Sequence, residues 1–249
     1  MKGFESDFEL PYLEIENVVA FSFYVIIVPM DSAKIGTCYL CGSPRNLTRD
    51  HVPPRGLFPS SMRENLITVE ACWDCNNAYS TDDEYFRVAV AVQGATRSSG
   101  LRIWKDKVVG SSFRRSAKLR SAVAQTLFPM PVVSPAGLYL GNVECVTFDS
   151  QRVNRVIEKI VRGLYRHHHP EVLLGAEVRM DVDMVLGNEV TASVCRGLRG
   201  ERVGGDVFCY WRGVVDDVPQ ESCWVLAFYL RTFFSVHTYL PIQVSNGGA

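Results

Sequence analysis

The clearest helical pattern in the first half of the chain begins near residue 81. Apolar side chains then recur at intervals of three and four residues, at Tyr85, Val88, Ala89 and Val92. This is the period of one buried helix face. Thr81 and Glu84 match the Thr-x-x-Glu capping box. Asp82 and Asp83 fall in the first turn, where the helix dipole favours acidic side chains. The pattern predicts a helix that begins at about Thr81.

A second helical stripe follows position 149. Its apolar members are Val153, Val156, Ile157, Ile160 and Leu164. Either Asp149 or Ser150 is suited to be its N-cap. After Pro170 the pattern changes to strand-like runs, which end in the apolar and aromatic segment 223–240. The last hundred residues therefore predict an α+β domain whose final segment is core strand.

Breaks in the pattern divide the chain into four parts. Residues 96–128 predict further helices, interrupted at 98–100 and at 110–112. Segment 129–141 carries prolines and glycines, which predicts a linker and a domain boundary. The expected parts are an N-terminal extension (1–30), a cysteine-bearing module (31–95), a helical segment with its linker (96–140) and a C-terminal α+β domain (141–249). The extension is either an edge strand or the product of a mis-assigned start, with Met30 in place of Met1.

Composition bounds the class of protein. The chain has 249 residues, of which 47% are apolar, enough to fill the core of one large domain or two smaller ones. The formal net charge is −1, so the chain as a whole is not a polycation. The longest apolar run, 18–28, is about half of the roughly 20 residues that a membrane-spanning helix needs. Acidic residues precede it where a signal peptide carries positive charge. We therefore expect no membrane association and a reducing, cytoplasmic location.

Four of the eight cysteines have metal-ligand spacing. Cys38 and Cys41 form one Cys-x-x-Cys pair, and Cys72 and Cys75 form a second pair after an interval long enough for a β-hairpin. Four thiolates complete the tetrahedral coordination of a structural Zn²⁺ ion. A disulfide or redox role is the alternative, but the secretory or thioredoxin-like context for it is missing. The four remaining cysteines stand singly among apolar residues and are expected to be buried thiols: Cys145, Cys195, Cys209 and Cys223.

Three side chains beside these pairs are suited to phosphodiester hydrolysis. Asp50 and His51 are adjacent in the interval, and Asn76 directly follows the last cysteine. His51 is a candidate general base, because its ordinary pKa lies near neutrality. Asp50 and Asn76 offer oxygen ligands, which suit a hard cation such as Mg²⁺ or Mn²⁺. Neighbouring residues on a regular strand point to opposite faces, so Asp50 and His51 can serve one site only if the strand bends there. The following Pro53-Pro54 predicts that the strand stops at once.

Segment 38–77 resembles the HNH endonucleases, in the variant whose last position is Asn rather than His. The matching parts are CxxC, an Asp-His-Val-x-Pro-like segment, Asn-Leu, and CxxC followed by Asn. The resemblance implies a treble-clef or ββα-metal module, built from a β-hairpin and a helix, with structural zinc on the four cysteines. It also implies His51 as general base, catalytic Mg²⁺ or Mn²⁺ on Asp50 and Asn76, and Asn65 as the residue that braces the hairpin loop. The expected activity is metal-dependent cleavage of nucleic acid.

The segment departs from the commonest family pattern at two points. Asn76 and Asn77 stand where a final His is usual, so the site should prefer Mg²⁺ or Mn²⁺ to softer ions. Asn77 is the alternative ligand to Asn76. Pro53 is an additional proline between His51 and Pro54, and Pro54 matches the family offset. Neither departure argues against an active enzyme.

A basic segment follows the module despite the neutral total charge. Eight basic side chains face one acidic side chain between residues 96 and 120: Arg97, Arg102, Lys105, Lys107, Arg114, Arg115, Lys118 and Arg120. Such a cluster can neutralise several phosphates, although a solvated helix face is the alternative. We therefore expect nucleic acid, and DNA first, as the partner. A homodimer and an inhibitor or activator protein are further candidates. The competing hypothesis is a non-catalytic zinc module that binds nucleic acid or protein.

Two further features lie in the helix after position 149. The basic side chains Arg152, Arg155, Lys159, Arg162 and Arg166 are expected to surround its whole polar face and form a subordinate nucleic-acid candidate. The run 167–169 consists of three histidines at the helix end, where they complement the dipole. Three consecutive side chains do not easily converge on one metal ion, so we assign no metal to them.

Overall fold

The structure is a computed structural model that describes residues 35–215 and 218–241, and these residues belong to one compact unit. The expectations for segment 1–30, including the choice between Met1 and Met30, lie outside the described residues. Helices and strands are mixed along the described part, which confirms the α+β class. No helix in this part of the chain is long and apolar enough to span a membrane.

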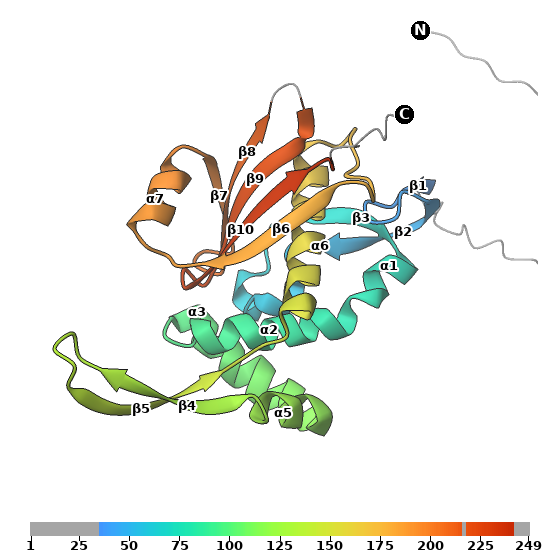
Figure 1. The fold of residues 1–249 in the computed structure, drawn as a ribbon. Helices are drawn as coiled ribbons and strands as arrows, with labels where there is room; N and C mark the ends of the chain where they lie inside the picture. Colours follow the sequence, from blue (N-terminus) through green and yellow to red (C-terminus); the bar gives the residue numbers. More distant parts are fainter. Residues whose placement is uncertain (1–34, 216–217, 242–249) are drawn as a thin grey trace, which may run out of the picture. The chain divides into compact units, whose positions relative to one another are not determined.

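The cysteine-bearing segment forms a three-stranded antiparallel sheet followed by two helices (Figure 1). Strand β1 (Ile35–Thr37) pairs with β2 (Pro44–His51), and β2 pairs with β3 (Thr68–Cys72). Helix α1 (Trp73–Ala78) begins directly after β3, and α2 (Ser80–Gly94) follows after one residue. The hairpin expected between the two cysteine pairs is therefore present as β2 and β3.

The loop between β2 and β3 closes over the core of the module. It contains two short 3₁₀ turns, η1 (Arg55–Leu57) and η2 (Ser60–Met62). Leu57 and Phe58 are fully buried, and the hydroxyl of Tyr229 donates a hydrogen bond to the backbone oxygen of Leu57 at 2.8 Å. The loop is thereby held by the C-terminal part of the chain.

Helix α2 begins earlier than the capping box predicts. Its N-cap is Tyr79, which has helical backbone angles, and no side chain caps the helix, so the predicted box of Thr81 and Glu84 is wrong. Because α1 and α2 meet at Tyr79 with little change of backbone conformation, no cap position is available at Thr81. Glu84 instead pairs with Arg87 at 3.2 Å and with Arg115 at 3.1 Å.

The next helices form a nearly continuous run. Helix α3 (Ser98–Ile103) leads into the π-helical segment η3 (Trp104–Ser112) and the short α4 (Phe113–Arg115). Segment 98–100 is the start of a helix, and 110–112 lies inside η3, so neither is the predicted interruption. The helical run is interrupted at Ser116, which has an extended backbone. Ser116 caps α5 (Ala117–Ala124) by accepting a hydrogen bond from the backbone N–H of Leu119.

Gly100 of α3 packs directly against the backbone at the end of α2. A Cβ atom added at Gly100 would overlap the backbone oxygen of Gly94, which cannot move aside like a side chain. We expect Gly100→Ala to lower the free energy of unfolding by the upper part of the roughly 1–3 kcal/mol that overpacking costs. Gly197→Ala is the matched control, because its added Cβ would lie 3.5 Å from the nearest atom, the Val194 oxygen. Urea unfolding compares the two variants, and an equal effect of both would contradict the prediction.

The segment predicted to be a linker is a β-hairpin. Strand β4 (Leu127–Val133) pairs with β5 (Tyr139–Val146) in an isolated two-stranded antiparallel sheet. Pro129 and Pro131 are accommodated because both strands of such a sheet are edge strands, where a missing N–H need not break the ladder. The prolines and glycines that indicated a linker therefore belong to an edge strand and its turn.

Helix α6 (Ser150–His168) lies against a five-stranded sheet (Figure 1). The side chain of Asp149 caps it by accepting from the N–H groups of Gln151 and Arg152, which decides between the two predicted caps. The sheet has the order β6-β10-β9-β8-β7, and α7 (Glu189–Arg196) connects β6 to β7. Its strands are β6 (Arg179–Val185), β7 (Arg199–Val203), β8 (Phe208–Val215), β9 (Val218–Phe228) and β10 (Thr232–Tyr239).

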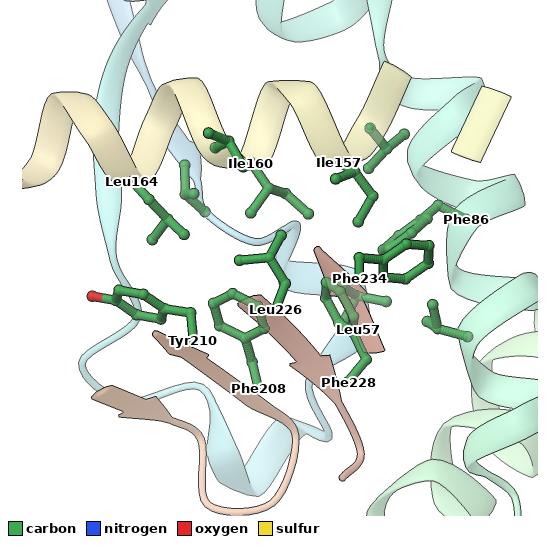
Figure 2. Close-up of a cluster of buried hydrophobic side chains, with 14 of the residues drawn as sticks. Leu57, Phe86, Ile157, Ile160, Leu164, Phe208, Tyr210, Leu226, Phe228 and Phe234 are labelled. Atoms are coloured by element: carbon green, nitrogen blue, oxygen red, sulfur yellow. The ribbon is translucent and has the colours of Figure 1, made fainter. Parts of the chain in front are cut away.

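The predicted apolar stripe of α6 is confirmed as a core face. Figure 2 shows side chains of α6 facing aromatic and aliphatic side chains of the sheet: Ile157, Ile160 and Leu164 against Phe208, Tyr210, Leu226, Phe228 and Phe234. Phe86 of α2 joins the cluster in an edge-to-face contact with Phe228. The final apolar segment is core, as predicted, in the form of β9 and β10. Of the four single cysteines, Cys209 is buried and the other three are half-buried.

His168 ends α6 in a partly buried chain of hydrogen bonds. The Tyr210 hydroxyl donates to Glu201 at 2.7 Å, so it accepts from Nε2 of His168 at 2.9 Å. Burial, reinforced by the positive charge of Arg212, lowers the pKa of His168 to about 4. Because the unfolded value is about 6.5, the unfolded chain binds the extra proton between these values. The contribution of His168 to the free energy of unfolding is therefore fully present above about pH 6.5, and it is lost as the pH drops towards 4.

We expect this pH dependence to be weaker in His168→Gln, which keeps a donor but does not titrate. The measurement is the free energy of unfolding in urea at several pH values between 4 and 7. The same slope in the wild type and the variant would contradict the prediction.

Candidate functional site

The four paired cysteines converge at one end of the β2–β3 hairpin. Cys38 and Cys41 lie in the β1–β2 turn, which Gly42 closes with φ 70°. Cys72 ends β3 and Cys75 lies in α1. The four Sγ atoms all lie within 4.8 Å of one another, and Cys41 Sγ and Cys72 Sγ are 3.9 Å apart. A tetrahedral zinc ion with Zn–S bonds of about 2.3 Å places its sulfurs roughly 3.8 Å apart. The cluster is therefore able to hold a metal ion such as zinc.

The four thiols differ in their surroundings. Burial raises the pKa of Cys38 and of Cys75. Hydrogen bonds from the backbone and hydroxyl of Ser43 lower the pKa of Cys41 to about 6. Cys41 is exposed whereas Cys38 and Cys72 are buried. The charge of a bound cation favours the thiolate form at every ligand, so the ion itself would offset the cost of burial.

Asp50 is nearly buried and anchored through one oxygen. The Tyr39 hydroxyl donates to Asp50 Oδ2 at 2.8 Å, and the ammonium of Lys159 lies 3.3 Å from the same oxygen. Both of these contacts are made to Oδ2 and not to Oδ1. The side chain of Asp50 is 6% exposed. Asp50 is thus a braced carboxylate with one oxygen left for a ligand.

His51 lies at the end of β2 on the other face of the strand. The ladder is regular here, with Asp50 opposite Val69 and His51 opposite Thr68. The strand has no bend before His51, so the two side chains leave it on opposite sides. β2 stops after His51, as the prolines predict, and a cis peptide bond joins Val52 to Pro53.

His51 is half-buried beside two arginines that the sequence reasoning did not single out. Burial is the main cause that lowers the pKa of His51, and the positive charges of Arg55 and Arg63 lower it further. The ring is therefore neutral at neutral pH, the state that accepts a proton. Arg55 follows Pro53-Pro54 directly, and this adjacency was the signal that could have identified it.

Asn76 is held against the face of β2 that carries Asp50. Its amide nitrogen donates to Thr48 Oγ1 at 3.1 Å and to the Arg49 backbone oxygen at 3.4 Å. Thr48 is two residues before Asp50 and so shares its face of the strand. With the amide nitrogen so engaged, the amide oxygen of Asn76 is the atom left for a ligand.

The other predicted asparagines are exposed. Asn77 lines a pocket of about 280 Å³ together with Asn76, Thr48 and Asp83. Asn65 lies in the loop before β3 with φ 55°, a conformation that Asn tolerates better than most residues. The bracing role of Asn65 and the choice between Asn76 and Asn77 as ligand stay predictions.

Lys159 of α6 lies beside Asp50 and also contacts the start of α2. Its ammonium lies 3.0 Å from Asp83 Oδ2 in addition to its contact with Asp50. Burial raises the pKa of Asp83 to about 6, although Lys159 opposes the shift. Asp83 Oδ1 is buried and has no hydrogen-bond partner within the described part of the chain. Sequence reasoning treated Asp83 as a helix-end charge and Lys159 as part of a basic face, so it missed both.

Most basic side chains of α6 are engaged by other groups of the protein. Arg152 and Arg155 hold the two carboxylate oxygens of Asp82 at 2.7 and 2.8 Å. Arg162 donates to backbone oxygens, including that of Gly175 at 3.1 Å. The prediction that this series surrounds the polar face is wrong. The spacing of three, four and three residues from Arg152 to Arg162 puts these side chains on one side of the helix, where Arg152, Arg155 and Lys159 meet the acidic start of α2.

The predicted basic path lies on α3 to α5. Seven of its eight side chains are exposed, and Lys107 is half-buried. Arg115 is engaged by Glu84, and Arg102 is 3.9 Å from Asp106. Both contacts are at the surface, where an ion pair contributes about 0–1 kcal/mol and gives way readily to a phosphate. Binding of nucleic acid to this path stays a prediction.

Comparison of the chain with protein-family models, curated sequences and solved structures found no match. Sulfur ligands at the cysteine cluster suit zinc, and the carboxylate and amide oxygens of Asp50 and Asn76 suit a hard cation. The orphaned oxygen of Asp83 nearby is a further indication that this region favours positive charge.

Proposed function

We propose that the chain is a metal-dependent endonuclease of the HNH kind that hydrolyses phosphodiester bonds, with DNA as the expected substrate. Segment 31–95 would be its treble-clef, ββα-metal module, with structural zinc on the four cysteines. One observation carries the proposal. A hairpin and the following helix carry a braced carboxylate, Asp50, and an amide, Asn76, on one side of β2, and the adjacent His51 and the four-cysteine cluster belong to the same module.

The residues have separate roles in the proposed reaction. His51 takes a proton from water as the water oxygen attacks phosphorus and the bond to the 3′ oxygen breaks. The products would carry 5′-phosphate and 3′-hydroxyl ends. Asp50 Oδ1 and the amide oxygen of Asn76 would hold Mg²⁺ or Mn²⁺, which supplies charge stabilisation to the departing oxygen when bound. Arg55 and Arg63 add positive charge on the side of His51.

The position of Asp50 and His51 at the end of β2 limits how a substrate can reach both side chains. Asp50 and His51 face opposite ways, so a substrate phosphate reaches both only around the end of β2, where the chain turns at Val52 and Pro53. Helices α3 to α5 would hold flanking phosphates through the exposed basic path.

A non-catalytic zinc module that binds nucleic acid or protein is the second candidate. The near-complete burial of Asp50 and its pairing with Lys159 favour it, because a catalytic metal ion needs an open coordination position for water or substrate. This candidate requires the cysteine cluster and the basic path but not His51.

A cleavage assay distinguishes the two. Zinc-loaded full chain is incubated with supercoiled plasmid, single-stranded DNA and RNA in Mg²⁺, Mn²⁺ or excess EDTA. The proposal expects cutting in Mg²⁺ or Mn²⁺, none in EDTA, and cutting about 10²–10⁴-fold slower with His51→Ala protein prepared in parallel. Absence of cutting by folded, zinc-loaded wild type on all substrates would overturn it and favour the binding module.

A further inference from the structure

Lys159 is the most completely buried charge beside the proposed site. Its side chain is 1% exposed, and its ammonium lies 3.0 Å from Asp83 Oδ2 and 3.3 Å from Asp50 Oδ2. The ring of Tyr79 lies 5.1 Å from the ammonium and closes another side of it. Water therefore has little access, and the two carboxylates are the main neighbours that balance the charge of Lys159.

The three charges form one electrostatic unit. Asp50 and Asp83 contribute two negative charges and Lys159 one positive charge. Without the ammonium, two carboxylates would share a poorly hydrated region, where like charges repel strongly. Asp83 already has a buried oxygen without a partner, so the described residues around it offer no other neutralising donor. Lys159 thus does for this pair of carboxylates what a bound cation does elsewhere.

The geometry separates Lys159 from the proposed metal position without removing its influence. Lys159 and Tyr39 both contact Asp50 Oδ2, which leaves Oδ1 for a metal ion. An ion on Oδ1 would nevertheless lie within several ångströms of the ammonium in a region of low dielectric. At such a separation, repulsion between the single charge of Lys159 and the double charge of the ion opposes binding of the ion strongly.

We propose that Lys159 is a built-in counter-cation that holds Asp50 and Asp83 in the metal-free protein and weakens divalent-cation binding at Asp50. This inference rests on the proposed metal position at Asp50. It assigns a positioning role to a residue of α6 that lies more than a hundred residues after Asp50 and His51 in the sequence. The C-terminal part of the chain would therefore form one wall of the site and set its affinity for the metal.

Mn²⁺ binding to the zinc-loaded full chain tests the inference without a nuclease assay. The free-Mn²⁺ signal in electron paramagnetic resonance gives the dissociation constant of the wild type, Lys159→Met and Lys159→Gln. Gln keeps a donor for the carboxylates and removes the charge. We expect both variants to bind Mn²⁺ at least about tenfold more tightly, and we expect Asp50→Asn in the Lys159→Met background to abolish the gain.

Arg155→Met is the matched control, because it removes a cation of α6 that pairs with Asp82 and does not contact Asp50. Its affinity for Mn²⁺ should change far less. Circular dichroism and zinc content establish folding of each variant. If a variant is unfolded without Mn²⁺, recovery of its structure on adding Mn²⁺ counts as tight binding, and failure to recover counts against the inference.

Unchanged or weaker Mn²⁺ binding in both folded variants would overturn the inference and leave Lys159 as a structural partner of Asp50. The outcome is separable from that of the nuclease proposal. Tighter binding through Asp50 in a protein that cuts no nucleic acid would leave the role of Lys159 standing. Cutting by the wild type with unchanged affinities in the variants would remove the role of Lys159 alone.

Discussion

Cys72→Ser is expected to unfold most of the protein and to abolish stoichiometric zinc binding. Cys72 is buried, ends β3 and is the N-cap of α1, so the ion at this position would join the hairpin to the helix that carries Asn76. Apparent binding free energies of structural zinc are about 10–16 kcal/mol. The whole stability of a folded domain is about 5–15 kcal/mol. Loss of the ion therefore exceeds what the remaining core is able to offset.

Zinc content per chain and thermal unfolding measured by circular dichroism provide the readout, and a strong chelator added to the wild type should reproduce the effect. Cys145→Ser is the control, because Cys145 is half-buried in β5 and lies outside the cluster. A Cys72→Ser protein with full zinc content and the wild-type melting temperature would show that the cluster is not a structural metal site.

His51→Ala is expected to lower the rate of metal-dependent cleavage by about 10²–10⁴-fold, the usual contribution of a general base. The loss should appear in the rate of the chemical step under single-turnover conditions. Binding of DNA should change little, because the basic path lies on helices α3 to α5 and does not include His51. Fold and zinc content should also persist, since His51 is only half-buried and has no part in the cysteine cluster.

His237→Ala is the matched control, since His237 is an exposed histidine of β10 and belongs to no proposed site. It should cut at the wild-type rate. Equal rates for His51→Ala and the wild type would assign the activity to another base or to a contaminating nuclease.

Local sequence signals were sufficient where the structure depends on neighbours along the chain. Each Cys-x-x-Cys pair brings its own two thiols together, and two such pairs predicted one four-cysteine cluster, which the structure contains. The apolar period of α6 predicted both the helix and its buried face, and Asp149 was one of two predicted caps. The capping box failed because α1 runs into α2, and a helix start depends on what precedes it.

The tertiary structure decided everything that depends on partners distant in sequence. Periodicity gives the faces of α6, but only packing shows that its basic side meets the acidic start of α2. Likewise, prolines and glycines predict irregular backbone, but only pairing shows that segment 127–146 is a hairpin.

The sequence by itself therefore determined the residue types available for chemistry: four thiols for a metal ion, and Asp50, His51 and Asn76 for a proposed hydrolytic site. The spacing of these residues along the chain is fixed by the covalent sequence. Only the tertiary structure decided the charge and accessibility of that site. It placed Asp50 and His51 on opposite faces of β2, and it brought Tyr39, Asp83 and Lys159 to Asp50. Burial and Coulomb interactions depend on distances in space, so no pattern along the chain could supply them.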